Sequence, residues 1–138
     1  MFRLLLVEDD PMDAALMVEA LRESQIVADL KVARGGAEAL AMLRHGTLPA
    51  GVWRPDLVLC DLRLPGLGGH ELLRQLKSDS RFRSIPVVIM SSSLAPLDVA
   101  RSQALEAYRH VLKPSDFGEL CTITRNLYES CLQPPGTL

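Results

Sequence analysis

The sequence has little net charge, few cysteines and no long hydrophobic run, and each shortage excludes a class of protein. The formal net charge is −2 and the isoelectric point is about 5.9, which gives no general attraction to nucleic acid or to anionic membranes. We see no apolar run of about 20 residues, the length that spans a bilayer. The stretch Met1–Val7 is too short, and too soon followed by acids, for a signal peptide. We therefore expect a cytoplasmic protein that binds neither nucleic acid nor membrane.

The three cysteines do not suggest a disulfide. Cys60 falls in a predicted buried strand, and Cys121 and Cys131 stand ten residues apart in a predicted helix. Ten helical residues span about 15 Å, too far for a bond between those two sulfurs. Reduced thiols agree with a cytoplasmic location.

The length and composition fit one folded domain. The chain has 138 residues, of which 48% are apolar, enough for a core and against disorder. We expect one domain over residues 1–132, a tail over 133–138 and no output domain.

Apolar runs closed by breaker residues or acids alternate with segments of helical periodicity. Uninterrupted apolar runs are typical of strands buried on both faces, and strict alternation predicts a doubly wound α/β fold with a five-stranded parallel sheet. The predicted strands are Arg3–Val7, Val27–Ala33, Leu57–Asp61, Pro86–Met90 and Tyr108–Leu112, and the predicted helices are Pro11–Glu23, Ala37–Leu43, His70–Lys77, Leu97–Leu105 and Ser115 or Asp116 to Cys131. A longer loop is expected over His45–Pro55.

Polar residues stand at the C-terminal ends of four predicted strands. Glu8 and Asp9 follow the first strand, Asp61 the third, Ser91 the fourth and Lys113 the fifth. Because ligands of open parallel sheets bind beyond these strand ends, we expect one common site. Neighbouring carboxylates repel unless a cation holds them, and hard oxygen ligands favour Mg²⁺ or Mn²⁺.

The same set of side chains suits phosphoryl chemistry. The hydroxyl of Ser91 and the ammonium of Lys113 can bind phosphoryl oxygens by hydrogen bond and by charge. An aspartate nucleophile such as Asp61 would form an acyl phosphate. Such a set of residues is typical of phosphoryl-transfer sites, in which positioning and charge neutralisation supply most of the catalysis.

Four ordered motifs give the chain a family resemblance. Over roughly Arg3–Leu127 it resembles the receiver domain of two-component response regulators. The long loop before the third strand, and the end of the chain soon after the receiver, resemble single-domain regulators paired with bacterial phytochromes. The resemblance implies a flavodoxin-like (CheY-like) strand order 2-1-3-4-5. The matching motifs are Leu5–Pro11, Asp61–Gly66 with Gly69, Ile85–Ser92 and Lys113-Pro114.

The resemblance implies a role for each residue of the expected metal site. Asp61 is the phosphoacceptor, which takes a phosphoryl group from a phosphohistidine of a sensor histidine kinase. Asp9 binds the divalent cation directly, Glu8 acts largely through a water, and the backbone carbonyl of Arg63 completes the set with Asp61. The protein is then a phosphoacceptor that signals through protein contacts rather than an enzyme.

The resemblance also implies the roles of the remaining residues. Ser91 binds the phosphoryl oxygen and moves toward it, while Lys113 pairs with the phosphate. The peptide bond between Lys113 and Pro114 is expected to be cis. Ser92 is small and leaves the acyl phosphate open to attack.

Two positions depart from the family pattern. His110 stands three residues before Lys113, where the family usually has the Tyr or Phe that rotates on activation; an imidazole can also swing but is titratable. It is either the switch residue with Ser91 or an exposed histidine without that duty. Glu106 replaces a usual Gly, so the fourth helix is expected to end differently. His45 and His70 are expected to face solvent.

The last helix carries two apolar stripes although a helix that covers a sheet needs one. Leu120, Ile123 and Leu127 form the first stripe. The second stripe is either part of a broad core face or, with the fifth strand, the interface of a symmetric homodimer. Its members include the expected interface residues Phe117, Thr124 and Tyr128.

Three other functions are alternatives to this interpretation. An aspartyl-phosphate phosphohydrolase would need a second Asp two residues after Asp61 as acid/base, but that position is Arg63. In a flavodoxin-like flavin carrier, the acids Glu8 and Asp9 would repel the flavin phosphate. A receiver acting only as an unphosphorylated scaffold is disfavoured by the complete set of polar residues.

Overall fold

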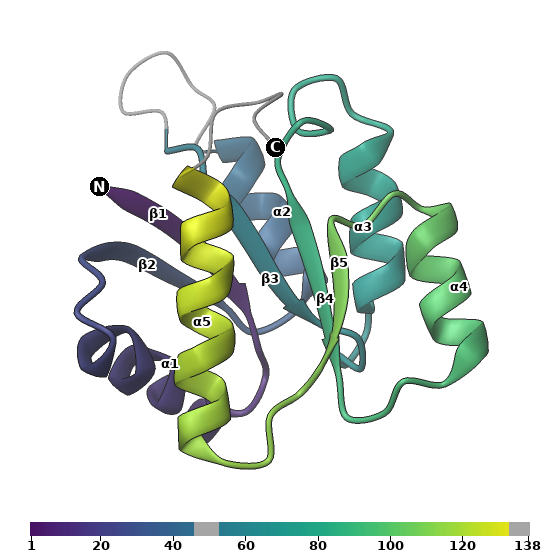
Figure 1. Ribbon diagram of the computed structural model, residues 1–138. Helices are drawn as coiled ribbons and strands as arrows, with labels where there is room; N and C mark the ends of the chain where they lie inside the picture. Colours follow the sequence, from purple (N-terminus) through teal and green to yellow (C-terminus); the bar gives the residue numbers. More distant parts are fainter. Residues whose placement is uncertain (46–52, 133–138) are drawn as a thin grey trace.

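The computed structural model describes residues 1–45 and 53–132. Five strands and five helices alternate along them (Figure 1). The strands are β1 (Phe2–Val7), β2 (Ala28–Ala33), β3 (Leu57–Asp61), β4 (Val87–Ser91) and β5 (Arg109–Leu112), and the helices are α1 (Pro11–Glu23), α2 (Gly36–His45), α3 (Gly69–Lys77), α4 (Pro96–Ala104) and α5 (Phe117–Leu132). Every predicted element is present, with ends within a few residues of those expected. The predicted tail, and most of the predicted loop before β3, lie outside the described residues.

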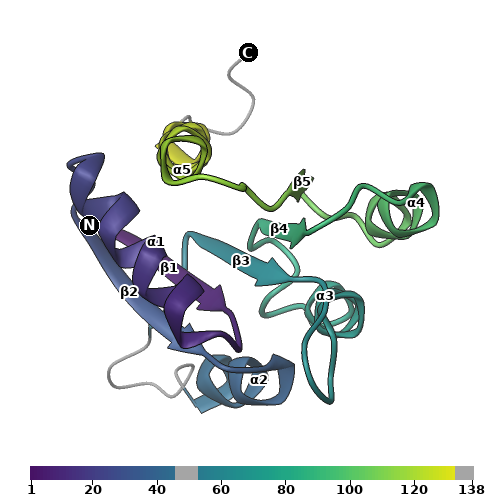
Figure 2. The same cartoon turned by 90° about the horizontal axis from the view of Figure 1, so that it is seen from below.

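The strands form one parallel sheet in the order β2-β1-β3-β4-β5, as predicted. Helices α1 and α5 cover one face, and α2 and α3 cover the other (Figure 2). Parallel strands joined by right-handed crossovers require this two-sided cover. Among the described residues no helix is both long and apolar enough to cross a membrane.

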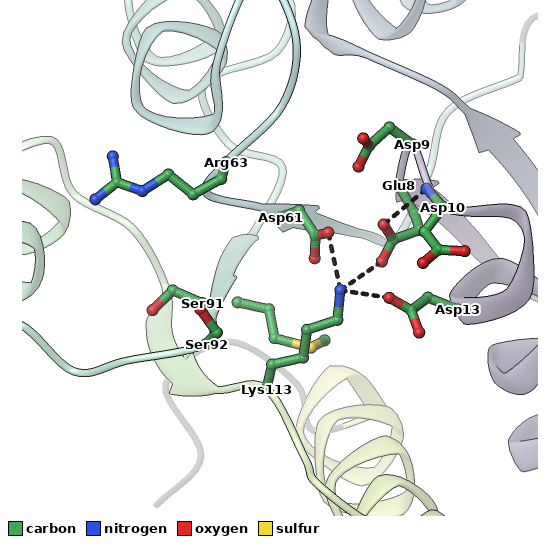
Figure 3. Close-up of a pocket in the computed structure, with 10 residues that line it drawn as sticks. Glu8, Asp9, Asp10, Asp13, Asp61, Arg63, Ser91, Ser92 and Lys113 are labelled. Atoms are coloured by element: carbon green, nitrogen blue, oxygen red, sulfur yellow. Dashed lines mark hydrogen bonds and ion pairs between the residues drawn. The ribbon is translucent and has the colours of Figure 1, made fainter.

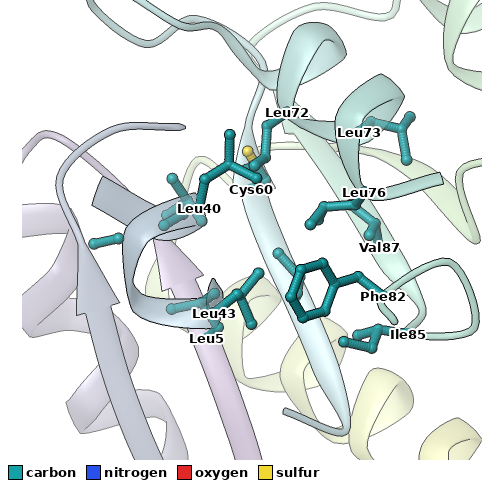
Figure 4. Close-up of a cluster of buried hydrophobic side chains, with 14 of the residues drawn as sticks. Leu5, Leu40, Leu43, Cys60, Leu72, Leu73, Leu76, Phe82, Ile85 and Val87 are labelled. Atoms are coloured by element: carbon teal, nitrogen blue, oxygen red, sulfur yellow. The ribbon is translucent and has the colours of Figure 1, made fainter. Parts of the chain in front are cut away.

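Successive strand residues point into opposite halves of the core, which explains the uninterrupted apolar runs. Leu5 and Val7 of β1 pack into the cluster beneath α2 and α3 (Figure 4). Leu4 and Leu6, one residue out of phase, pack beneath α1 and α5. The half beneath α2 and α3 is closed by buried leucines of these two helices and by Phe82 from the turn after α3. The leucines are Leu40, Leu43, Leu72, Leu73 and Leu76.

Local capping explains where the helices near the sheet's C-terminal edge begin. Asp10 caps α1 by accepting a hydrogen bond from the Met12 N–H at 2.9 Å. Asp116, rather than Ser115, caps α5, because its Oδ1 accepts from the Glu119 N–H at 2.8 Å. These caps fix the starts of both helices beside the strand ends that carry the predicted site.

Helix α4 is followed by a left-handed turn although Glu106 is not a glycine. Glu106 adopts a left-handed backbone with φ of 64°, and its N–H donates to the Gln103 carbonyl at 3.0 Å. The expectation of a different helix end is therefore wrong. The chain keeps the left-handed turn and accepts the strain of a side chain there.

Trp53, the only tryptophan, closes the sheet at the edge opposite the predicted site. Its indole Nε1–H donates to Asp29 Oδ2 at 2.8 Å, and the Lys31 ammonium lies 4.8 Å from the ring centre. The ring also packs against the core beneath α2 and α3. Trp53 thus joins the start of the β3 segment to the edge strand β2.

Candidate functional site

The polar residues predicted at the strand ends come together in one cavity of about 280 Å³ (Figure 3). Glu8 follows β1, Asp61 ends β3, Ser91 ends β4 and Lys113 follows β5. The residues that line the cavity are Glu8, Asp9, Asp10, Asp13, Asp61, Arg63, Met90, Ser91, Ser92 and Lys113.

The ammonium of Lys113 lies among three carboxylates (Figure 3). Its Nζ is 2.9 Å from Glu8 Oε1, 3.0 Å from Asp61 Oδ2 and 2.8 Å from Asp13 Oδ2. Burial opposes the charge of Lys113, but these three hydrogen bonds outweigh it and raise the pKa of the ammonium. Lys113 is therefore held positively charged at the centre of the acids.

Asp13 is a site residue that the sequence reasoning missed. It stands in the first turn of α1, three residues after the cap Asp10. That helical spacing turns its carboxylate back toward the end of β1, where it meets Lys113. The sequence shows an acid in the first turn of the helix, but only the fold shows that it contacts Lys113, which follows β5.

Asp61 is an unusual carboxylate. Its side chain is 13% exposed, and burial first, then Glu8, raises its pKa to about 7, against the opposing effect of Lys113. Three carboxylates that share the one ammonium of Lys113 leave negative charge in excess. A divalent cation is the natural complement of this excess.

The carboxylates of Glu8, Asp9 and Asp61 fit such a cation. Each offers one oxygen, and the three oxygens lie within 4.8 Å of one another. Glu8 Oε2 accepts from the Asp10 N–H at 3.1 Å, and Oε1 accepts from Lys113, which together orient the carboxylate. An all-oxygen donor set is what Mg²⁺ and Mn²⁺ prefer.

Arg63 lines the same cavity, but its guanidinium turns away from Asp61 (Figure 3). It binds Asp98 of α4, with 3.0 Å between NH2 and Oδ2. The residue two positions after Asp61 thus provides no acid/base group to the site, because its charged side chain is paired with Asp98.

Ser91 and His110 are in direct contact. The Ser91 hydroxyl donates to the Ser93 carbonyl at 2.5 Å and lies 2.8 Å from His110 Nε2. Burial lowers the pKa of His110. His110 is half-buried against Ser91, so the expectation of an exposed histidine is wrong, while its duty as the switch residue stays a prediction.

Three expectations are corrected by the structure. The Lys113–Pro114 peptide bond is trans, the ordinary preference of most X–Pro bonds. His70 is buried at 8% exposure, because its ring bonds to Ser102 of α4 at 2.8 Å.

Thr124 is buried within the protomer and cannot lie on an outer stripe of α5. Its hydroxyl donates to the Leu120 carbonyl at 2.7 Å, which satisfies it inside the helix.

The other two expected interface residues lie at the surface to different extents. Phe117 is 39% exposed at the start of α5. Tyr128 is half-buried and packs edge-on against Phe2 with ring centres 5.1 Å apart. Much of the second stripe of α5 therefore belongs to the core.

A parallel sheet in this order, with an aspartate, an acid pair, a serine and a lysine at its C-terminal edge, defines a receiver. The model of the response regulator receiver domain matches residues 4–125. The chain therefore belongs to the response regulator receiver domain family, as the sequence motifs predicted.

Two named proteins are similar to this chain over most of its length. Response regulator Rcp1 of Synechocystis sp. is 32% identical over 124 residues, which cover 90% of this chain and 84% of that protein. The probable methanogenesis regulatory protein FilR2 of Methanothrix harundinacea is 37% identical over 121 residues, or 86% and 76% of the two chains.

Two solved structures of response regulators are similar to this fold. The phosphorylated cyanobacterial phytochrome response regulator RcpA has a TM-score of 0.85 at 36% identity and covers 96% of this chain and 94% of its own. The Mn²⁺-bound form of Rcp1 has a TM-score of 0.83 at 31% identity, with coverage of 100% and 99%. The predicted likeness to phytochrome response regulators is thus confirmed.

Proposed function

We propose that Asp61 accepts a phosphoryl group from a phosphohistidine of a sensor histidine kinase. The observation that carries the proposal is the meeting of Asp61, Lys113 and the acid pair Glu8–Asp9 at one sheet edge. An Asp61 oxygen attacks phosphorus, the bond from phosphorus to the kinase imidazole nitrogen breaks, and the imidazole takes up a proton as it leaves. The phosphoryl group then sits within reach of Ser91 and Lys113.

Each neighbour of Asp61 has a part in this transfer. Lys113 exchanges one of its carboxylate contacts for a phosphoryl oxygen and neutralises its charge. Ser91 turns its hydroxyl from the Ser93 carbonyl to another phosphoryl oxygen. Glu8, Asp9, Asp61 and the Arg63 carbonyl are the proposed ligands of Mg²⁺ or Mn²⁺. When bound, this cation offsets the charge of the phosphoryl oxygens and lets two anions approach.

Phosphorylation by a small donor tests this assignment. Wild type with acetyl phosphate and Mg²⁺ is expected to gain one acid-labile phosphate, which Asp61→Asn and chelation by EDTA both abolish. Asp13→Asn is the matched control, because Asp13 also binds Lys113 but lies outside the proposed metal set. Equal labelling of wild type and Asp61→Asn would refute the proposal.

The proposed kinase is a bacteriophytochrome. Support comes from the likeness to the phytochrome response regulator RcpA and from the exposed apolar side chains of Leu16 and Phe117, which line a pocket that also includes Asp61 and Lys113. Apolar surface beside a reactive site is typical of a docking surface. A purified bacteriophytochrome kinase is expected to phosphorylate the chain faster than an unrelated histidine kinase does. Equal transfer rates would contradict this pairing.

We also propose that the output is protein contact, with no turnover of other substrates and no binding of nucleic acid. Arg63 occupies the position where a phosphohydrolase needs an acid, and its guanidinium is paired with Asp98. Incubation with a phosphomonoester such as p-nitrophenyl phosphate is expected to release no more than one phosphate per chain. Sustained release that depends on Asp61 would favour the phosphohydrolase.

A homodimer through β5 and α5 is the remaining proposal. β5 is an edge strand with Leu112 47% exposed, and Phe117 begins the adjoining α5. Sedimentation of Leu112→Glu is expected to give a lower mass than wild type. Leu97→Glu on α4, where the side chain is 85% exposed, is the control and should leave the mass unchanged. Identical masses for wild type and Leu112→Glu would exclude this interface.

A further inference from the structure

A continuous line of hydrogen bonds leads from Ser91 away from the cavity. His110 Nε2 lies 2.8 Å from Ser91 Oγ, His110 Nδ1 lies 2.7 Å from Ser102 Oγ, and Ser102 Oγ lies 2.8 Å from His70 Nε2. The line crosses from the end of β4 through β5 and α4 to α3, elements that stand next to one another in Figure 1. We name these four residues, Ser91, His110, Ser102 and His70, the serine–histidine relay.

Three of the four relay residues are buried and His110 is half-buried, so their polar groups depend on one another. Ser102 is 0% exposed, Ser91 6% and His70 8%. In the described part of the chain, every buried side-chain nitrogen or oxygen has a hydrogen-bond partner. A buried hydroxyl or imidazole that loses its partner carries a large desolvation cost. A change at one end of the relay therefore forces the other members to respond.

The direction of each hydrogen bond follows from the contact at Ser93. A carbonyl has no proton, so the 2.5 Å contact requires Ser91 to donate its hydroxyl proton to the Ser93 oxygen. His110 must then donate to Ser91 from Nε2. In a neutral imidazole Nδ1 is an acceptor, so Ser102 donates to His110 and itself accepts from His70 Nε2.

A proton added to the relay reverses part of it. When His110 is positive, its Nδ1–H donates to Ser102, Ser102 turns to donate to His70 Nε2, and His70 carries its proton on Nδ1. The two imidazoles are thus linked by Ser102, and the tautomer of His70 reports the charge of His110.

Nearby charges favour a positive charge at the His110 end. Burial, then Arg101, lower the pKa of His70, with a further lowering from His110 and Arg63 and an opposing effect of Asp98. Burial also lowers the pKa of His110, but there Asp98 is the charged neighbour and it opposes the lowering. A phosphoryl group bound by Ser91 would add negative charge on the His110 side.

We infer that Ser102 and His70 are positioning residues of the phosphorylation switch, which set the protonation and orientation of His110 and so control the release of the Ser91 hydroxyl from Ser93. The inference rests on the proposed phosphorylation of Asp61. When Ser91 turns to the phosphoryl oxygen, the relay carries the change through Ser102 to His70 on α3.

Nitrogen-15 NMR of the histidine rings tests the relay directly. Beryllium fluoride with Mg²⁺ serves as the phosphoryl mimic, and its fluorine-19 signal shows whether it is bound. In the free wild type, both His110 and His70 are expected to carry the proton on Nε2 above pH 7. On addition of the mimic near pH 6, His110 is expected to gain a proton and His70 to move toward the Nδ1 tautomer. His45, at the end of α2, is the internal control and should not respond.

Two variants separate a relay from a structural contact. Ser102→Ala removes one buried oxygen, and the response of His70 to the mimic should disappear while the mimic still binds. Ser102→Thr keeps the hydroxyl and should restore the response. A His70 that is unmoved in wild type, or that responds equally in Ser102→Ala, would overturn the inference. Failure of the mimic to bind wild type would instead contradict the proposed role of Asp61.

The affinity for the mimic gives a second, independent measurement. Protonation of Asp61 weakens binding of the mimic at low pH in wild type and Ser102→Ala alike. Because His110 becomes positive more readily beside the mimic, the affinity of wild type relative to Ser102→Ala should be higher at pH 6 than at pH 8. Each unit by which the mimic raises the pKa of His110 adds up to about tenfold in affinity. In Ser102→Ala the Nδ1–H of a positive His110 lacks its acceptor, so this gain should shrink. An identical pH dependence in the two proteins would count against the relay.

Discussion

Replacing Asp61 with asparagine is expected to stabilise the metal-free protein at pH 8, although it removes a contact with Lys113. The pKa of Asp61 is about 7 in the folded protein, chiefly because burial disfavours its charge and Glu8 lies beside it. In the unfolded chain the same group ionises near 3.8. The folded state therefore holds this proton more tightly, and stability is lost as the pH rises from about 4 to about 7.

The size of the effect follows from the two pKa values. The difference between 3.8 and about 7 corresponds to about 4 kcal/mol at full strength. The cavity is open to solvent on one side, so screening reduces the expected gain to about 1–2 kcal/mol. Asparagine has no charge at any pH, and the gain should be near zero at pH 4, where Asp61 is protonated in the folded protein.

Urea unfolding in EDTA at pH 4, 6 and 8 measures this gain. Asp13→Asn is the control, because its carboxylate is 34% exposed against 13% for Asp61 and should matter less. Millimolar Mg²⁺ should narrow the gap at pH 8, since a cation that binds the folded wild type stabilises it. The reasoning fails if Asp61→Asn is less stable than wild type at pH 8 in EDTA. In that case attraction to Lys113 would outweigh burial and repulsion.

Three stability predictions follow from particular contacts. Glu106→Gly relieves a φ of 64° and should add about 1 kcal/mol to the free energy of unfolding in urea. Glu129→Gly within α5 is the control and should lower that free energy by about 1 kcal/mol. Equal effects of the two substitutions would show that the backbone at Glu106 is not strained. Gly69→Ala places a Cβ 2.5 Å from the Asp61 carbonyl oxygen, so a loss of about 2–3 kcal/mol is expected in a thermal melt. Leu76→Ala empties a fully buried position and should cost about 2–5 kcal/mol by urea unfolding; a loss under about 1 kcal/mol would mean that the core closes around the cavity.

The sheet was predictable because its signals are local. Each central strand is a short apolar run that ends at a breaker or an acid, and parallel strands buried on both faces need no alternation. The strand ends then placed Asp61, Ser91 and Lys113 together without any knowledge of distances. The one missed cavity residue with a charge contact, Asp13, depended on the direction of a helical side chain.

The errors arose where a polar side chain finds its partner in another element or in its own helix. His70 looks like the exposed start of a helix, and only the packing of α4 against α3 brings Ser102 to its ring. Thr124 looks like part of an outer stripe, but a helical hydroxyl can be buried cheaply when it bonds back to the carbonyl four residues earlier. Neither partner can be found from hydrophobic periodicity.

Trp53 is an intrinsic fluorescent probe whose position separates the signal of unfolding from that of cation binding or phosphorylation. As the only tryptophan, it accounts for nearly all emission excited at long ultraviolet wavelengths, and its indole is held by Asp29 and Lys31 of β2. It precedes β3, whereas Asp61 ends that strand, so the fluorophore and the reactive carboxylate lie at opposite ends of one strand. Unfolding should therefore shift the emission strongly, while cation binding and phosphorylation leave it nearly constant. A single spectrum can then report the folded fraction without interference from the state of the switch.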